Sequence, residues 1–147
     1  MNLSKALKQK NRIAGEIDTL KTLLTSQNVK PSTQKFDYQA EDLLRDLQAK
    51  IAELVELKAQ IAIANVEIYT KIFRLAEIKG LTKTLKDLDT RSGLFKEGEG
   101  YGQSPYDVEY VAQISKTEAD TLVTGFESEI ETLQDELDAF NFTTTVG

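Results

Sequence analysis

The chain of 147 residues contains no cysteine, no histidine and no tryptophan, and only two prolines. Without cysteine it cannot form disulfides, zinc ribbons, iron–sulfur clusters or a thiol nucleophile. Without histidine it lacks the commonest general base, a common metal ligand and every Ser-His or Cys-His catalytic pair. The sequence therefore predicts a non-enzymatic protein with no catalytic residues, no cofactor and no metal site.

Long apolar runs are also missing, since no segment approaches the roughly 20 apolar residues that a membrane-spanning helix needs. The first residues become amphipathic at once, without the apolar block of a signal peptide. Charged residues make up 29% and apolar residues 40% of the chain, a balance typical of folded, soluble proteins. We expect one cytoplasmic domain over residues 1–147 that does not bind a membrane.

The net charge of −6 is unevenly distributed along the chain. Residues 1–35 contain seven Lys/Arg against two Asp/Glu, whereas residues 81–147 contain five against fourteen. The acidic total argues against non-specific binding to nucleic acid. We expect instead that a basic first helix and an acidic last helix attract each other, within one chain or between two.

Apolar residues at alternating spacings of three and four predict an all-α antiparallel helical bundle with long, coiled-coil-like helices. The expected helices cover residues 2–27, 38–79, 81–91 and 116–141. Pro31 should lie in the loop after the first helix, and Gly80 should separate the second helix from the third. Ser115, followed three residues later by Glu118, matches a capping box at the start of the last helix.

Between the third and fourth helices, residues 93–114 are predicted to form a glycine-rich loop or a small β-hairpin. The alternation of Tyr106, Val108 and Tyr110 favours a short strand there. A phosphate-binding loop is not supported, because no Gly-Lys-Ser/Thr follows the glycines and the nearby glutamates would repel phosphate. The tail after residue 141 carries strand-like residues but is too short to predict as a strand.

The second predicted helix is apolar on more sides than the first helix can cover. At 1.5 Å per residue the second helix would be about 63 Å long and the first about 39 Å, so cover would end near residue 63. Extra apolar residues widen the stripe of the second helix after about residue 54. We therefore expect self-association, most simply as a symmetric dimer, through the part of this helix that runs from Ile61 to Leu75.

The candidate interface residues lie on one stripe of that helix and are Ile61, Asn65, Ile68, Ile72 and Leu75. A polar residue such as Asn65 in an apolar seam can fix register and oligomeric state. The alternative is that the stripe drifts around the helix and leaves Asn65 exposed to solvent.

Three segments resemble parts of small bacterial helical proteins of unassigned activity, including those labelled septicolysin-like. The segments are Ala59–Val66, Ile72–Glu77 and Leu133–Thr144. The resemblance implies a helical, oligomeric protein and gives no support for a cytolytic activity.

The leading interpretation is an oligomerisation, scaffold or protein-interaction protein that binds copies of itself or an unidentified protein partner. The alternative is a nucleic-acid accessory protein that uses the basic first helix, with Lys5, Lys8, Lys10 and Arg12 on it. A carboxylate-based enzyme would need a buried Asp or Glu in a cleft, where burial can shift its pKa.

Overall fold

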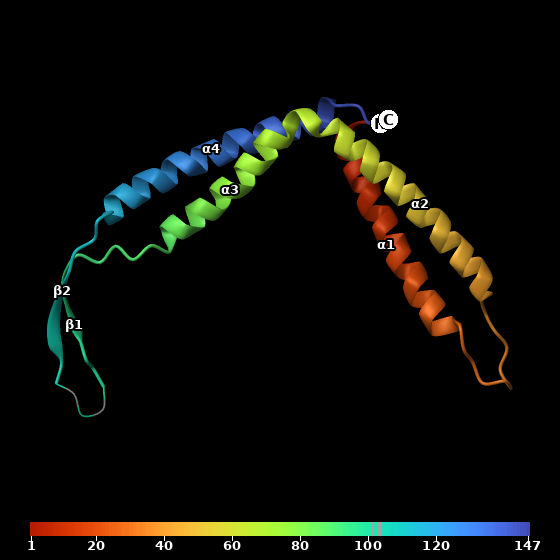
Figure 1. Ribbon diagram of the computed structural model, residues 1–147, viewed down its shortest axis with the longest axis horizontal. Helices are drawn as coiled ribbons and strands as arrows, with labels where there is room; N and C mark the ends of the chain where they lie inside the picture. Colours follow the sequence, from red (N-terminus) through yellow and green to blue (C-terminus); the bar gives the residue numbers. More distant parts are fainter. Residues whose placement is uncertain (101, 103) are drawn as a thin grey trace. The chain divides into compact units, whose positions relative to one another are not determined.

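The computed structural model describes residues 1–100, 102 and 104–147 (Figure 1). In these residues the chain forms four α-helices, with an antiparallel β-hairpin between the third and the fourth. The predicted mostly α-helical fold with a small β-hairpin at this position is confirmed. The chain divides into two compact units, Met1–Tyr69 with Leu137–Gly147 and Thr70–Glu136.

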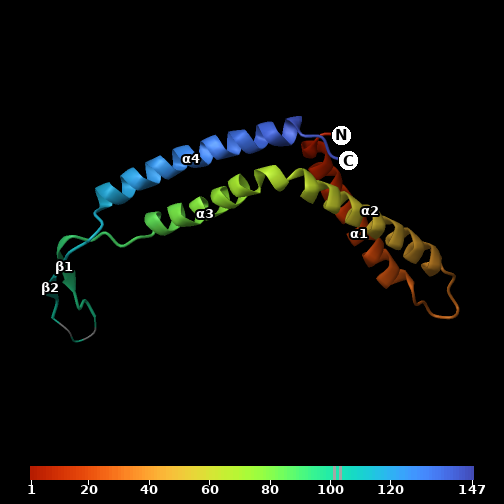
Figure 2. The ribbon, with the colours of Figure 1, turned by 45° about the horizontal axis from the view of Figure 1, so that its top comes forward.

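The first unit contains a helical hairpin. Helices α1 (Leu3–Gln27) and α2 (Ala40–Ala64) are joined through the loop that contains Pro31, and they lie side by side in both views (Figures 1 and 2). The side chain of Asn2 caps α1, because its Oδ1 accepts a hydrogen bond from the Lys5 N–H at 2.9 Å. The first helix thus agrees with the predicted range of 2–27 to within one residue.

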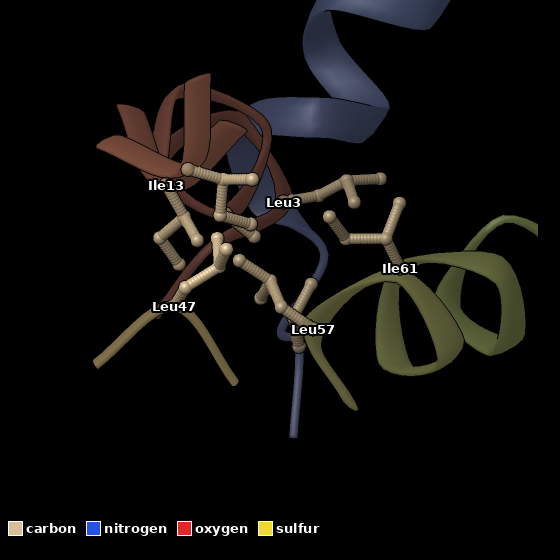
Figure 3. Close-up of a cluster of buried hydrophobic side chains, with 8 residues drawn as sticks. Leu3, Ile13, Leu47, Leu57 and Ile61 are labelled. Atoms are coloured by element: carbon tan, nitrogen blue, oxygen red, sulfur yellow. The ribbon is translucent and has the colours of Figure 1, made fainter. Parts of the chain in front are cut away.

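The core of the first unit is a narrow apolar seam between α1 and α2 (Figure 3). Leu3, Ala6 and Ile13 are fully buried, at 0% exposure. The complete cluster of buried side chains is Leu3, Ala6, Ile13, Ile17, Leu47, Leu57, Ile61 and Val146. Its members on each helix recur at helical spacing, so a single stripe on α1 is buried against a single stripe on α2.

The two ends of the chain are joined in what we call the terminal clasp, residues 1–3 with residues 144–146. The Leu3 N–H donates to the Thr144 carbonyl at 2.8 Å, and the Val146 N–H donates to the Met1 carbonyl at 2.9 Å. This bridge places the Val146 side chain in the core, where it is 6% exposed. The tail, too short to predict as a strand, is therefore ordered by pairing with the opposite end of the chain.

The predicted second helix, residues 38–79, is interrupted. Helix α2 ends at Ala64, a 3₁₀ turn η1 covers Val66–Ile68, and α3 runs over Tyr69–Lys86. The Ile68 N–H bonds to the Asn65 carbonyl at 3.0 Å, the tighter bonding of a 3₁₀ turn. Asparagine is a weak helix former, and its Oδ1 here is buried without a hydrogen-bond partner among the described residues. The α-helix thus gives way to a 3₁₀ turn at the point where Asn65 interrupts the run of apolar residues.

The predicted boundary at Gly80 is wrong, because α3 continues through it to Lys86. A glycine inside a helix costs about 1 kcal/mol relative to alanine, which neighbouring packing can offset. Ile78 and Thr82, on either side of Gly80, are 2% and 5% exposed. Residues 81–86 of the predicted third helix, residues 81–91, are therefore the last part of α3, and residues 87–91 are not helical.

The second unit pairs α3 with α4 (Lys116–Thr143), and the two lie side by side in both views (Figures 1 and 2). The predicted cap of the last helix is present, since the Glu118 N–H donates to Ser115 Oγ at 3.1 Å. The buried residues of this unit are Leu75, Ile78, Thr82, Ala119 and Leu133.

Ion pairs join α3 to α4 within the chain, and the expected attraction between the first helix of one chain and the last helix of another stays a prediction. Arg74 Nε lies 3.0 Å from Glu129 Oε1, and Lys71 and Lys86 lie 2.7 Å from Glu136 and Glu127 respectively. These three acidic side chains of α4 thus pair with α3 in the second unit. Each pair is exposed to solvent, so each contributes little to stability by itself.

The hairpin consists of β1 (Gly93–Glu97) and β2 (Tyr106–Tyr110), paired in antiparallel register. Phe95 faces Val108, Leu94 faces Glu109 and Lys96 faces Asp107. Gly93 and Gly98, which bound β1, have φ values of +105° and +78°, a region that favours glycine. Residues 101 and 103 of the predicted loop lie outside the described residues.

Candidate association surface

The structure covers most of the predicted interface residues within the chain itself. Ile61 and Ile68 are 7% and 6% exposed in the first unit, and Leu75 is 8% exposed in the second. Asn65 and Ile72 are half-buried. Three of the five side chains therefore have no free surface to offer a partner.

A second row of apolar side chains on α2 and its end is free. Its members follow one another at spacings of three, four, three and four residues and are all exposed: Ala52, Val55, Ala59, Ala62 and Val66. We call this row the outer seam. Val55 and Val66 are 63% and 66% exposed, and the adjacent Ile63 is 73% exposed. This spacing is that of a coiled-coil seam.

The outer seam lies roughly opposite the side of α2 that packs on α1. The buried positions Leu47, Leu57 and Ile61 face α1, and at 3.6 residues per turn the outer seam falls on the other side of the helix. The sequence already showed the excess of apolar residues past position 54. The sequence predicted association through the stripe of α2 that is buried within the chain. Residue spacing alone does not show which of the two apolar stripes of α2 packs against α1.

A groove of about 810 Å³ runs between α1 and α2 on another side of the hairpin. The small residues Gly15 and Ala49 leave space in this groove, and charged side chains also line it. Lys50 Nζ lies 2.9 Å from Glu16 Oε2, and Arg12 lies 3.0 Å from the other oxygen of Glu16. The hydrogen bond from Lys50 lowers the pKa of the Glu16 carboxyl below its ordinary value of 4.5, against a smaller opposing effect of burial.

This ion pair predicts a pH dependence of stability. Because the Glu16 pKa is lowered by folding, its contribution should be fully present above pH 4.5 and be lost as the pH falls through the folded pKa. Glu16→Gln should therefore reduce stability at neutral pH and match the wild type in acid. Urea unfolding at several pH values measures this difference, and added salt should shrink it. An equal difference at every pH would contradict the prediction.

The β-hairpin carries a cluster of polar side chains that bond to one another. The Arg91 guanidinium stacks on the Tyr110 ring, 4.1 Å from its centroid, and binds both carboxylate oxygens of Asp89. The Tyr110 hydroxyl donates to Glu97 Oε1 at 2.5 Å, a hydrogen bond that raises the pKa of Tyr110. Because these groups satisfy one another, the cluster stabilises the hairpin and offers no open ligand position.

The basic residues of α1 do not form a concentrated positive surface. Lys5 and Lys8 are exposed, Lys10 is half-buried, and Arg12 is paired with Glu16. Phosphate binding depends on the number of free cations at the contact, so this face gives limited support to the nucleic-acid alternative.

The described residues contain neither a candidate metal site nor a membrane-spanning helix. Within them, no group of three or more acidic, histidine or cysteine side chains is placed to hold a metal ion. Thr82 is the one buried polar residue found there, and each described Asp and Glu residue is at least partly exposed. None of the helices in this part of the chain is both long and apolar enough to cross a membrane.

Comparison of the chain with protein-family models, with curated proteins and with solved structures gives no match. The resemblance to septicolysin-like proteins thus stays a prediction from the sequence.

Proposed function

We propose that this protein is a non-enzymatic scaffold whose copies associate through the outer seam of α2. The observation that supports the proposal is the heptad spacing of five exposed apolar or small residues, opposite the side of α2 already buried against α1. Contiguous exposed apolar surface of this kind marks interaction sites in monomers. A second copy of the chain is the partner, because the row is complementary to itself.

Self-complementarity follows from the order of large and small residues. Two copies can pack antiparallel along α2 and the first residue of η1, about a two-fold axis between residues 60 and 61. Ala59 of one copy then faces Ala62 of the other, and Val55 faces Val66. The central alanines allow close approach of the two helices, while the valines fill the ends of the contact.

The charges beside the outer seam agree with this alignment. Glu56 and Lys58 flank the row on opposite sides. In the antiparallel alignment Lys58 lies beside Asn65 of the second copy and Glu56 lies beside its Ile63, so no like charges meet. The half-buried Asn65 then lies at the edge of this contact, and not within the seam as the sequence predicted.

The expected affinity is modest. Burying Val55, Ile63 and Val66 in both copies yields on the order of 10 kcal/mol, at about 1.5 to 2 kcal/mol for each side chain. Association costs an estimated ~4 to 15 kcal/mol before any contact is counted. The net is then at best about −6 kcal/mol, so we expect dissociation constants of tens of micromolar or weaker, and association that depends on protein concentration.

Sedimentation across the micromolar range tests the proposal with Val55→Glu. A charge introduced into the outer seam cannot be buried unpaired, so the contact should be lost, with the dissociation constant of this interface raised at least 10-fold. Val29→Glu is the matched control, because Val29 is 79% exposed and lies outside the outer seam. The control should associate like the wild type.

Two results would contradict the proposal. A wild-type chain that stays monomeric at the highest concentration would remove self-association altogether. A Val55→Glu chain that associates as strongly as the Val29→Glu chain would remove the outer seam as its surface. Circular dichroism of both variants should show unchanged helix content, since both residues are exposed.

A further inference from the structure

The hairpin offers two open strand edges. Among the described residues β1 pairs with β2 and with no other strand. Leu94 in β1 is 71% exposed and Tyr106 in β2 is 57% exposed. A lone two-stranded hairpin is marginally stable in water, and an open edge is a template for a further strand.

The two edges differ in how well they are protected. Strand β2 carries Asp107 and Glu109, and Pro105, directly before it, has no N–H to donate to a neighbouring strand. Two β2 strands paired about Val108 would set Asp107 of each opposite Glu109 of the other, which is repulsive. Strand β1 carries Lys96, already opposed by Asp107 within the hairpin, and Glu97 at its end, which accepts a hydrogen bond from the Tyr110 hydroxyl.

We propose that β1 is a second self-association surface, which pairs antiparallel with β1 of another copy about Phe95. The two hairpins then form a four-stranded sheet with β1 strands at its centre. Phe95 lies opposite Phe95 of the second copy, and each is already opposed by Val108 in its own hairpin. One face of the sheet thus gains a continuous apolar row across four strands, enough for a stable small sheet.

This inference builds on the proposed scaffold function and gives it a second contact. The outer seam belongs to the first unit and β1 to the second. Each contact is two-fold and uses the same surface of both copies. A chain with two such surfaces can bind two different neighbours at once, so copies can join in series.

The test uses the full chain with the outer seam blocked by Val55→Glu. This chain should still form dimers at high concentration, through β1. Adding Leu94→Lys should weaken those dimers about 10-fold, because residue 94 lies opposite Lys96 of the second copy, twice in each dimer. Within its own hairpin the new lysine faces Glu109, an attractive pair, so the hairpin itself should be kept. Val111→Lys is the matched control, at an 84% exposed valine outside β1.

The register can be checked directly because the wild-type chain has no cysteine. Leu94→Cys and Lys96→Cys chains should form a mixed disulfide when oxidised together, since these residues are opposite each other in the proposed pairing. Either variant alone should cross-link much less.

The outcomes separate this proposal from the outer seam. A strictly monomeric Val55→Glu chain, from a wild type that dimerises, would overturn pairing through β1 and leave the outer seam in place. Stronger association after Leu94→Lys would also overturn it, since that result means pairing of β1 with the acidic β2 of the next copy. Dimers of Val55→Glu that Leu94→Lys weakens and Val111→Lys does not would support it, whatever the outer seam does.

Discussion

Ile13→Ala should lower the free energy of unfolding by about 2 to 5 kcal/mol. Ile13 is completely buried in the cluster that α1 and α2 share, together with Leu47 and Leu57 (Figure 3). Truncation removes apolar contacts and leaves a cavity that two helices with a single shared seam can fill only by moving together. Urea titration followed by circular dichroism measures the loss.

Ile13→Val provides the scale for this prediction. It removes one methylene and should cost about 0.5 to 1.5 kcal/mol. The two losses should therefore differ several-fold. A cost below about 1 kcal/mol for Ile13→Ala would mean that the seam tolerates a gap, and that the two helices are not held by the cluster seen in the structure.

Val146→Asp should lower the free energy of unfolding by about 2 to 4 kcal/mol. A carboxylate is not tolerated in the apolar core without a partner, so the tail should leave the core instead of burying it. The protein would then lose the burial of Val146 and the two backbone bonds of the terminal clasp, Leu3 to Thr144 and Val146 to Met1. The loss of unfolding free energy cannot exceed the stability that the clasp contributes, because the carboxylate is solvated once the tail has left the core.

The adjacent residue supplies the control for Val146→Asp. Thr145 is exposed, so Thr145→Asp introduces the same charge one residue away without placing it in the core. Its effect should stay within about 0.5 kcal/mol. Hydrogen exchange of the first turns of α1 should accelerate in Val146→Asp and stay unchanged in Thr145→Asp. Equal effects of the two variants would show that the tail does not pack as described.

The sequence predicted correctly those helix positions that depend on one local pattern, either an apolar stripe or a capping residue. The stripe from Leu3 to Ile17 gave α1, and the Ser115 cap gave the start of α4. The alternation of Tyr106, Val108 and Tyr110 predicted β2 for the same reason: strand side chains repeat with a period of two residues. In each case the residues that determine the element lie within it.

Where two local signals compete, packing decides and the sequence alone does not. Gly80 is the poorer helix former, yet the helix continues through it and changes at Asn65. The same holds for the two apolar stripes of α2, because α1 occupies the stripe of Ile61 and leaves that of Val55 exposed. The terminal clasp was harder still, since its partners are almost the whole chain apart and share no local pattern.

The clasp also bears on the order in which the molecule is made. The second unit, Thr70–Glu136, is one continuous stretch, whereas the first unit is assembled from Met1–Tyr69 and Leu137–Gly147. During translation α1 and α2 leave the ribosome first, at about 5 to 20 residues per second, but Val146 arrives only after the whole second unit. Until then the apolar end of α1 around Leu3 lacks the cover that Val146 gives it. The unit synthesised first is therefore the one completed last, and nascent chains should be most exposed to chaperones and to one another at this end.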